Sequence, residues 1–292
     1  MQPTLVDTAV GPIELADAGT GPAVLFVHGM PGDWSQAAPL ARELADDHRV
    51  LLVSRPGYGR TPLQVGLTPQ ATAMAYRALL DALDIERAAV VGISGGGPSA
   101  YAFAAHERDR CDRLVLACAV NLDSRVLPTL LRFLHAIPVL PDVLGRWDRK
   151  RKLQALEDPD ALLQRALSEA NDVERARIAD DPVAVEWLVE FVTHNLRVTE
   201  DMRPFRHDLR TIVRHQRGRQ RLAWPDGAQV PTLIMHGDAD EVVDIQCARD
   251  YERLIPGAEV AVYPGAGHGF LFTFRREAMA QLRAFLDAVP AT

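Results

Sequence analysis

The segment Val90-Val91-Gly92-Ile93-Ser94-Gly95-Gly96-Gly97-Pro98 joins an apolar, β-branched run to the helix-like run Ser99 to His106. A serine between two glycines, where a strand turns into a helix, can be held on a sharp bend with its Oγ exposed. Gly92 and Gly96 suit that bend because a Cβ at either position would contact the neighbouring strand or helix. The helix also directs free N–H groups and its positive dipole end toward the space beside Ser94. Such a turn can present a reactive serine or hold a phosphate.

The phosphate interpretation lacks the expected glycine spacing. The chain has no Gly-x-x-x-x-Gly-Lys-Ser/Thr segment, and it lacks the Gly-x-Gly-x-x-Gly spacing that a dinucleotide-binding fold places near its N-terminus. The reactive-serine interpretation is therefore favoured. It requires a base and an acid from elsewhere in the chain.

Apolar runs typical of strands covered on both faces recur at a spacing of about 30 residues. They occupy positions 24–27, 50–53, 90–93, 114–119, 233–235 and 260–263. Amphipathic, helix-like stretches separate them, at 36–47, 69–83, 245–254 and 275–288. Strands that alternate with helices predict a parallel sheet covered on both faces. The alternating run Ile13 to Asp17 is typical of a half-exposed edge strand.

The alternation stops at Asn121 and resumes only at Pro231. The residues between are rich in Leu, Arg and Glu at helical spacing, and the stretch is too long for a loop. We therefore predict an inserted helical subdomain at 122–225, within a core made of 1–121 and 226–292. The basic runs Arg146 to Lys152 and Arg214 to Arg221 are interpreted as solvated helix faces.

Composition limits the class of protein. The chain has 292 residues, a hydrophobic content of 48% and a net charge of −7. The negative charge argues against nucleic acid as a partner, and no apolar run reaches the eighteen or so residues of a membrane span. Met1 to Glu14 lacks the features of a secretory signal, and three distant cysteines imply no disulfide framework. We expect a cytoplasmic protein that acts on a small molecule; monomer and homodimer are both left open.

Two residues later in the chain are suited to act with Ser94. His268 follows the last apolar run in a glycine-rich loop that leaves room for an imidazole, and Asp240 follows an earlier run. Because ligand and catalytic sites form at the carboxyl ends of parallel strands, the loops carrying these residues are expected to lie together. Serine, histidine and aspartate are the residue types of a nucleophile, a base and an orienting acid.

Five motifs make the chain resemble the α/β-hydrolase superfamily over nearly its whole length. They are His28-Gly29-Met30-Pro31, Arg55-Pro56-Gly57-Tyr58-Gly59, Gly92-Ile93-Ser94-Gly95-Gly96, Gly237-Asp238-Ala239-Asp240 and Gly265-Ala266-Gly267-His268. The order Ser, Asp, His along the chain is also the order of that superfamily. Ser54 departs from the pattern, because an aspartate is common there. The resemblance implies an eight-stranded, mostly parallel sheet with helices on both faces, an inserted helical cap over the site, and neither cofactor nor metal.

Carried over by position, the resemblance implies a role for each site residue. Ser94 is the nucleophile, His268 the general base and then acid, and Asp240 the acid that orients His268. The backbone N–H groups of Met30 and Gly95 form the oxyanion hole. The structural positions around the site are His28, Gly29, Gly92 and Gly96. The competing candidates for the acid are Asp123, Asp238 and Asp244.

The nucleophile narrows the chemistry that the resemblance implies. Ser94 argues against dehalogenases and epoxide hydrolases of this fold, which use aspartate, and Gly95 stands where proline iminopeptidases typically have tryptophan. We predict hydrolysis of a carboxylic ester of a small, hydrophobic substrate. Its pocket is predicted to include Trp34, Ile93 and Phe270. The alternatives are a C–C bond hydrolase, a peptidase, a cofactor-free peroxidase, or a ligand-binding protein without catalysis.

Overall fold

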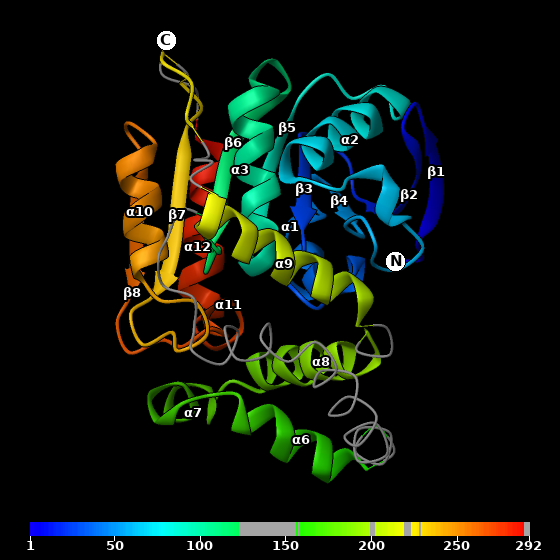
Figure 1. Ribbon diagram of the computed structural model, residues 1–292. Helices are drawn as coiled ribbons and strands as arrows, with labels where there is room; N and C mark the ends of the chain where they lie inside the picture. The colour runs from blue at the N-terminus through cyan, green and yellow to red at the C-terminus, as the bar shows by residue number, and fades with distance from the viewer. Residues whose placement is uncertain (123–155, 157, 199–201, 219–222, 228, 289–292) are drawn as a thin grey trace.

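The structure is a computed structural model that describes residues 1–122, 156, 158–198, 202–218, 223–227 and 229–288. Eight strands form one sheet in the order β1-β2-β4-β3-β5-β6-β7-β8 (Figure 1). The strands are β1 (Thr4–Thr8), β2 (Gly11–Ala18), β3 (Ala23–Val27), β4 (Arg49–Val53), β5 (Ala88–Ile93), β6 (Cys111–Ala117), β7 (Thr232–Gly237) and β8 (Glu259–Tyr263). β2 is antiparallel to both of its neighbours, and all other pairs are parallel. The predicted eight-stranded, mostly parallel sheet is confirmed.

The registers of the central strands place four loops at one edge of the sheet. Val27 at the end of β3 pairs with Val53 of β4 and with Gly92 of β5. Ile93, the last residue of β5, pairs with Ala117 at the end of β6. The segments that follow these residues therefore leave the sheet side by side, as the apolar runs and their glycine-rich ends predicted.

Two strand predictions need correction. The run from Ile13 to Asp17 does not form the edge, because β1 pairs with β2 outside it and β4 pairs with it inside. β1 is mostly exposed and carries no apolar run, so periodicity gave no signal for it. The fourth apolar run ends at Ala117 rather than residue 119, because Cys118 has a φ of +41° and leaves the extended conformation.

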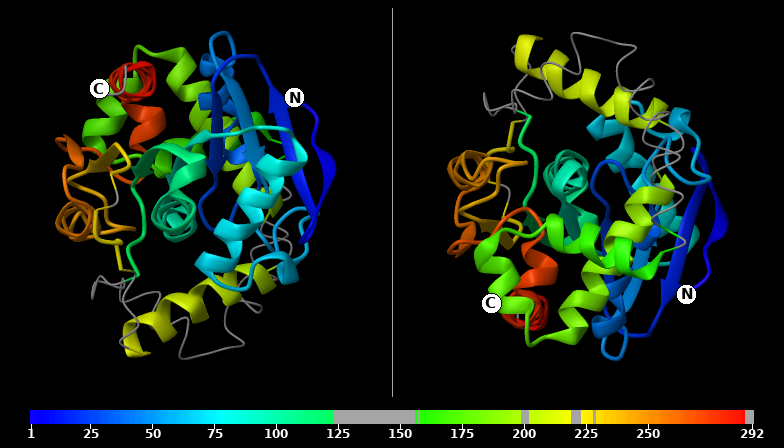
Figure 2. Two further views of the ribbon diagram at one scale, coloured as in Figure 1. Left: turned by 90° about the horizontal axis from the view of Figure 1, so that it is seen from above. Right: turned by 90° about the horizontal axis from the view of Figure 1, so that it is seen from below.

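Helices cover both faces of the sheet (Figure 2). One face packs against α1 (Ala38–Leu44) and α12 (Arg275–Asp287), and the other against α2 (Pro69–Ala82), α3 (Gly97–His106) and α10 (Gln246–Leu254). Alternate residues of the strands contribute to the two cores: Phe26 and Val91 face the first, Leu25 and Val90 the second. Helix α2 begins as its sequence predicts, with the Thr68 hydroxyl accepting the Ala71 N–H at 3.1 Å.

Four described helices lie between β6 and β7 in the chain. They are α6 (Pro159–Ser168), α7 (Asp172–Ile178), α8 (Pro182–Val198) and α9 (Arg203–Gly218). α6, α7 and α8 lie beyond the carboxyl ends of the strands in Figure 1. Trp187 and Leu188 of α8 are buried in one core with Phe270 and Phe272 of the core domain. The exact boundaries at 122 and 225 stay a prediction.

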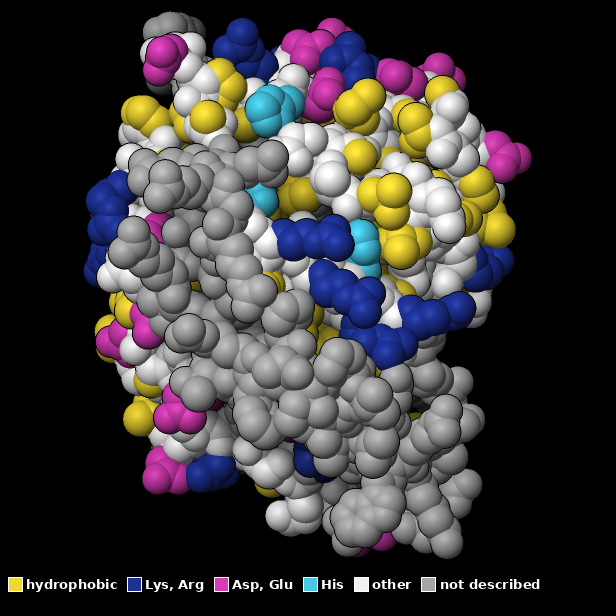
Figure 3. Space-filling view, in the orientation of Figure 1, with side chains coloured by type: hydrophobic (Ala, Val, Ile, Leu, Met, Phe, Trp, Pro, Cys, Tyr) yellow, Lys and Arg dark blue, Asp and Glu magenta, His cyan; other side chains and the backbone are white. Residues whose placement is uncertain are grey.

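Helix α9 has one apolar and one basic side. Phe205, Leu209 and Ile212 are buried, whereas Arg210 and Arg214 are exposed. Figure 3 shows Lys and Arg side chains gathered on the face of the molecule that α9 crosses in Figure 1. The basic run 146–152 lies outside the described residues. Within the described part of the chain, no helix has both the length and the apolar character needed to span a membrane.

Candidate active site

The turn after β5 holds Ser94 in a strained conformation. Ser94 has a φ of +48° and begins a short 3₁₀ turn (Ser94–Gly96) that continues into α3. A Cβ on Gly92 would lie 2.6 Å from the Cβ of Ala100, and one on Gly96 would lie 2.3 Å from the carbonyl oxygen of Val27. Neither position tolerates a side chain without movement of the backbone or of α3. The strain at Ser94 is therefore imposed by close packing of the strand, the turn and the helix.

The structure brings Ser94, His268 and Asp240 into one chain of hydrogen bonds. His268 Nε2 lies 3.1 Å from Ser94 Oγ, and His268 Nδ1 lies 2.7 Å from Asp240 Oδ2. A carboxylate only accepts, so Nδ1–H donates to Asp240 and Nε2 is left to accept the Ser94 hydroxyl proton. This is the tautomer that a base for Ser94 requires.

The remaining contacts of Asp240 hold its carboxyl group in one orientation. Oδ1 accepts the N–H groups of Val242 at 2.8 Å and Val243 at 2.9 Å. Burial acts to raise the pKa of Asp240, but the hydrogen bond and charge of His268 and the Val243 N–H outweigh it, so the pKa lies below its usual value. Asp240 is therefore ionised at neutral pH and directs one oxygen at His268.

Asp238 and Asp244, the other described candidates for the acid, make hydrogen bonds elsewhere and none to His268. Asp238 accepts the Gly265 N–H at 2.6 Å, and Asp244 accepts the Gln246 N–H at 2.7 Å. The Asp238 bond joins the loop after β7 to the loop that carries His268, and the Asp244 bond fixes a local turn. Asp123 lies outside the described residues. The buried ring of His236 lies next to Asp240, with Nε2 3.5 Å from Asp240 Oδ2. Its Nε2–H donates to the Val243 carbonyl at 2.8 Å. Burial lowers the pKa of His236, which favours the neutral ring.

The loop after β3 lies against the serine turn. A Cβ on Gly95 would lie 3.1 Å from the Met30 nitrogen, and one on Gly29 would lie 3.1 Å from the Ser94 Cβ. The backbones of Met30 and Gly95, whose N–H groups the sequence analysis assigned to an oxyanion hole, are thus neighbours beside Ser94. Two N–H donors that bind one oxyanion have to be neighbours, so this arrangement is compatible with the predicted oxyanion hole.

His28 is part of the structure of this loop. Its Nδ1–H donates to the Gly29 carbonyl at 2.7 Å, and its Nε2 accepts the Arg55 N–H at 2.9 Å. Burial and the charge of Arg55 lower the pKa of His28 well below its usual value. Both ring nitrogens are therefore occupied by the backbone, and the ring is neutral.

Two further polar side chains hold the loop that contains Met30. Gln36 Oε1 accepts the Gly29 N–H at 2.6 Å, and Gln36 Nε2 donates to the Pro31 carbonyl at 3.0 Å. Gln36 Nε2 also donates to Asn195 Oδ1 of α8 at 3.1 Å. Neither residue was predicted, because a glutamine and an asparagine in separate segments of the chain carry no local signal of such a role.

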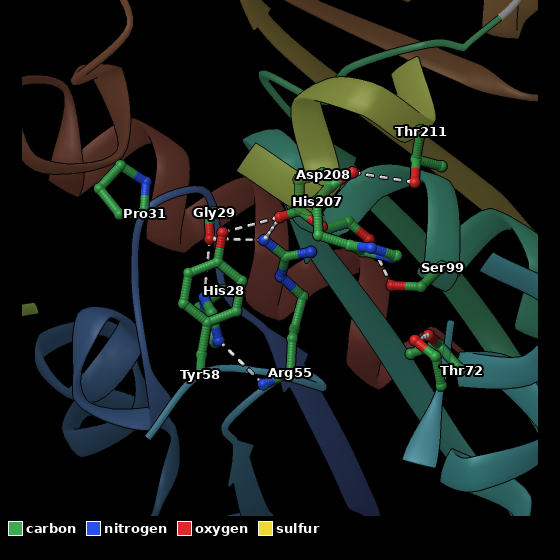
Figure 4. A network of polar contacts seen from close by, with 12 residues as sticks. His28, Gly29, Pro31, Arg55, Tyr58, Thr72, Ser99, His207, Asp208 and Thr211 are labelled. Carbon is green, nitrogen blue, oxygen red and sulfur yellow. Dashed lines mark hydrogen bonds and ion pairs between the residues drawn. The ribbon is translucent and has the colours of Figure 1, made fainter. Parts of the chain in front are cut away.

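Arg55 ties helix α9 to the same loop (Figure 4). Its Nη2 donates to Asp208 Oδ2 at 2.7 Å and to the Gly29 carbonyl at 3.1 Å, and Tyr58 Oη donates to the same Asp208 oxygen at 2.8 Å. The Tyr58 ring meets the His28 ring edge-on at 5.1 Å. The Arg-Pro-Gly-Tyr-Gly turn therefore links α9 to the loop beside Ser94.

A cavity of about 680 Å³ opens onto Ser94 and His268, between the sheet edge and the helices α7 and α8. Its described apolar wall includes Ile93, Leu188, Phe191, Leu271 and Phe272. Ile93, one of the three residues predicted for the substrate pocket, is part of this wall. The other two predicted pocket residues do not line this cavity. Phe270 is fully buried and stacks on Tyr263, and Trp34 lies outside the cavity wall, its backbone N–H bound to Ser54 Oγ.

Phe270 is excluded from the cavity because the short helix α11 (Phe270–Thr273) begins at this residue. The first side chain of that helix turns toward the sheet, and the next two, Leu271 and Phe272, reach the cavity. Among the residues that the structure describes, no group of three His, Cys, Asp or Glu side chains is arranged to hold a metal ion.

The profile of the family described as "alpha/beta hydrolase fold" matches residues 22–274. The chain belongs to the α/β hydrolase fold family. An α/β hydrolase fold protein from Nakamurella multipartita superposes with a TM-score of 0.74 at 28% identity, covering 97% of this chain and 99% of that one.

The names of similar proteins state different activities. The chain is 25% identical to 2-hydroxy-6-oxo-2,4-heptadienoate hydrolase of Pseudomonas putida over 94% of this chain and 92% of that one. It is 26% identical to the esterase YbfF of Escherichia coli, over 84% and 85%. It is 34% identical to the uncharacterized hydrolase YcgS of Bacillus subtilis, but only over 38% and 39%. These names all describe hydrolases, but they do not agree on the kind of substrate that is hydrolysed.

Proposed function

We propose that this α/β hydrolase cleaves a carboxylic ester of a small substrate through an acyl-enzyme on Ser94. The observation that carries the proposal is the continuous hydrogen-bonded chain from Ser94 Oγ through His268 to Asp240, with separations of 3.1 and 2.7 Å. A serine hydroxyl is a weak nucleophile unless a positioned base accepts its proton. Here the base has the required tautomer, and its acid is ionised.

Each residue has a defined task in the proposed reaction. Ser94 Oγ attacks the ester carbonyl carbon while His268 Nε2 takes the hydroxyl proton, and Asp240 stabilises the imidazolium. The N–H groups of Met30 and Gly95 bind the oxyanion; losing one such donor typically costs about 3–4 kcal/mol of transition-state stabilisation. His268 then protonates the leaving alcohol. A water, deprotonated by His268, attacks the acyl-enzyme and releases the acid and Ser94.

The inserted residues 122–225 are proposed to be a cap that closes the cavity over Ser94. Helices α7 and α8 supply one wall of the cavity, including Leu188 and Phe191, and the core supplies Leu271 and Phe272. These side chains suit a hydrophobic acyl or alcohol group. The cap would also exclude bulk water, which strengthens the interactions of the oxyanion with its donors.

The name of the heptadienoate hydrolase raises C–C bond hydrolysis as a second candidate for the same residues. A dienoate is an anion. The described lining of the cavity contains the carboxyl groups of Glu169, Asp172 and Glu241 and neither Lys nor Arg. This charge pattern favours an uncharged ester. A panel of 4-nitrophenyl esters and dienoates, compared by kcat/KM, separates the two reactions.

A fluorophosphonate probe tests the activated serine directly. We expect one adduct by intact mass on the wild-type protein and none on Ser94→Ala or His268→Ala. Ser168→Ala removes an exposed serine that does not line the cavity and should leave labelling unchanged. Absence of labelling of the folded wild-type protein, or full labelling of Ser94→Ala, contradicts the proposed function.

A further inference from the structure

A buried carboxyl group from the inserted helices contacts the loop that carries His268. Glu174 of α7 is only 1% exposed. Its Oε1 accepts the Gly267 N–H at 3.0 Å and the Thr273 hydroxyl at 2.7 Å, and its Oε2 accepts the Asn171 N–H at 3.0 Å. A carboxyl group is rarely buried to this extent unless specific donors bind it. Here two of three donors belong to the segment around His268.

Asn171 adds a further bond to the same segment. Its Nδ2 donates to the Gly265 carbonyl at 3.0 Å, and its Oδ1 accepts the Glu174 N–H at 3.0 Å. Asn171 and Glu174 thus form a capping box at the start of α7 that also binds residues outside the helix. A Cβ on Gly267 would lie 2.9 Å from Glu174 Oε2, so the carboxyl group lies directly against the backbone.

We propose that Glu174 positions the base His268 by holding the backbone beside it. This inference rests on the function proposed above. The loop from Gly265 to Gly269 contains three glycines, which restrict the backbone little. The His268 ring itself is bound by Asp240 and Ser94. Glu174 binds the backbone one residue before His268 and, through Thr273, the helix that follows it.

The position of Glu174 couples the inserted helices to the chemistry. Misplacement of a reacting group by about 1 Å can cost on the order of 100-fold in rate. If α7 moves away from the sheet edge, Gly267 and Thr273 lose the acceptor that holds them. His268 is then correctly placed only while α7 is docked. Entry of substrate must therefore leave α7 in place, or catalysis must await its return.

Three variants distinguish a role of Glu174 in positioning His268 from a general destabilisation of the inserted helices. Glu174→Ala removes all three acceptor contacts. Glu174→Gln retains an oxygen that can take the place of Oε1 and accept from Gly267 and Thr273. Asp158→Ala is the matched control: it removes the N-terminal cap of α6, where the carboxyl group accepts the N–H groups of Asp160 and Ala161. That change weakens the same inserted region without touching the histidine loop.

The kinetic readout is kcat and KM for 4-nitrophenyl butyrate. We expect Glu174→Ala to lower kcat by about 100-fold with KM changed by less than about 3-fold, since ground-state binding does not need His268. Glu174→Gln should recover kcat to within about 10-fold of wild type. Asp158→Ala should stay within about 3-fold. An equal loss of kcat in Asp158→Ala and Glu174→Ala overturns the proposal.

Amide hydrogen exchange provides a readout that needs no activity. Exchange of the segment 264–274 should be at least about 10-fold faster in Glu174→Ala than in wild type and unchanged in Asp158→Ala. Unchanged exchange in Glu174→Ala overturns the positioning role. If Glu174→Ala does not fold, Thr273→Val and Glu174→Gln are compared instead, and equal kcat to wild type in Thr273→Val overturns the proposal. A wild-type protein without probe labelling or ester hydrolysis refutes the proposed function, while exchange still decides whether Glu174 holds the loop.

Discussion

The substitution Asp240→Asn tests the hydrogen-bonded chain at its buried end. In the native protein, Oδ1 accepts two backbone N–H groups, from Val242 and Val243, and Oδ2 accepts from His268 Nδ1. The asparagine oxygen must stay opposite the two N–H donors, because the alternative places an amide NH₂ against both of them. The NH₂ group then faces His268 Nδ1. That nitrogen must become an acceptor, and the proton moves to Nε2, which can no longer accept from Ser94.

The expected loss is large although the change in volume is negligible. A base held in the wrong tautomer typically costs about 10⁴-fold in kcat. At about 1.36 kcal/mol for each tenfold change, this corresponds to about 5.4 kcal/mol of transition-state stabilisation. The fold should persist, because two hydrogen bonds to Oδ1 remain. The assay is kcat for 4-nitrophenyl butyrate together with the rate of fluorophosphonate labelling.

The matched controls are Asp238→Asn and Asp244→Asn, which change carboxyl groups in the same loop that bind only backbone N–H groups. Both should keep kcat within about 3-fold of wild type. A loss of less than 10-fold in Asp240→Asn would refute the assignment of the acid. If Asp123→Asn then abolished activity, the acid would be Asp123.

Three further outcomes follow from burial. Burial lowers the pKa values of His28 and His236 below the ordinary 6.5, so the unfolded chain binds more protons than the fold as the pH falls. The free energy of unfolding should therefore decrease by on the order of 1–3 kcal/mol between pH 7.5 and pH 5.5, as measured by urea denaturation. Asp208→Ala leaves the guanidinium of Arg55 buried without its carboxylate, and urea denaturation should show a loss of about 3–5 kcal/mol. Gly96→Ala places a Cβ 2.3 Å from a backbone oxygen of β3 and should cost about 2–3 kcal/mol and abolish probe labelling; an unchanged denaturation midpoint would contradict the packing argument.

The fold was predictable because its signals are local. The central strands β3, β4, β5 and β7 consist mainly of apolar residues, since both of their faces are buried, and glycine lies within or shortly after the end of each of them. β1 was not predicted, because an exposed edge strand buries few side chains and therefore shows no apolar run. The burial of Phe270 could not be read from the sequence, because a shift of one residue along a helix changes whether a side chain faces the core or the cavity.

The sequence by itself determined which residues meet at the sheet edge. Parallel strands align their carboxyl ends, so Ser94, Asp240 and His268 come together without knowledge of any side-chain contact. Only the tertiary structure decided what holds these loops in place. Gln36 and Glu174 hold these loops through hydrogen bonds that depend on how separate segments of the chain pack, and Glu174 lies 93 residues from Gly267 in the chain. Such contacts have no periodicity and no motif, because they arise from packing between elements rather than from the conformation of either one.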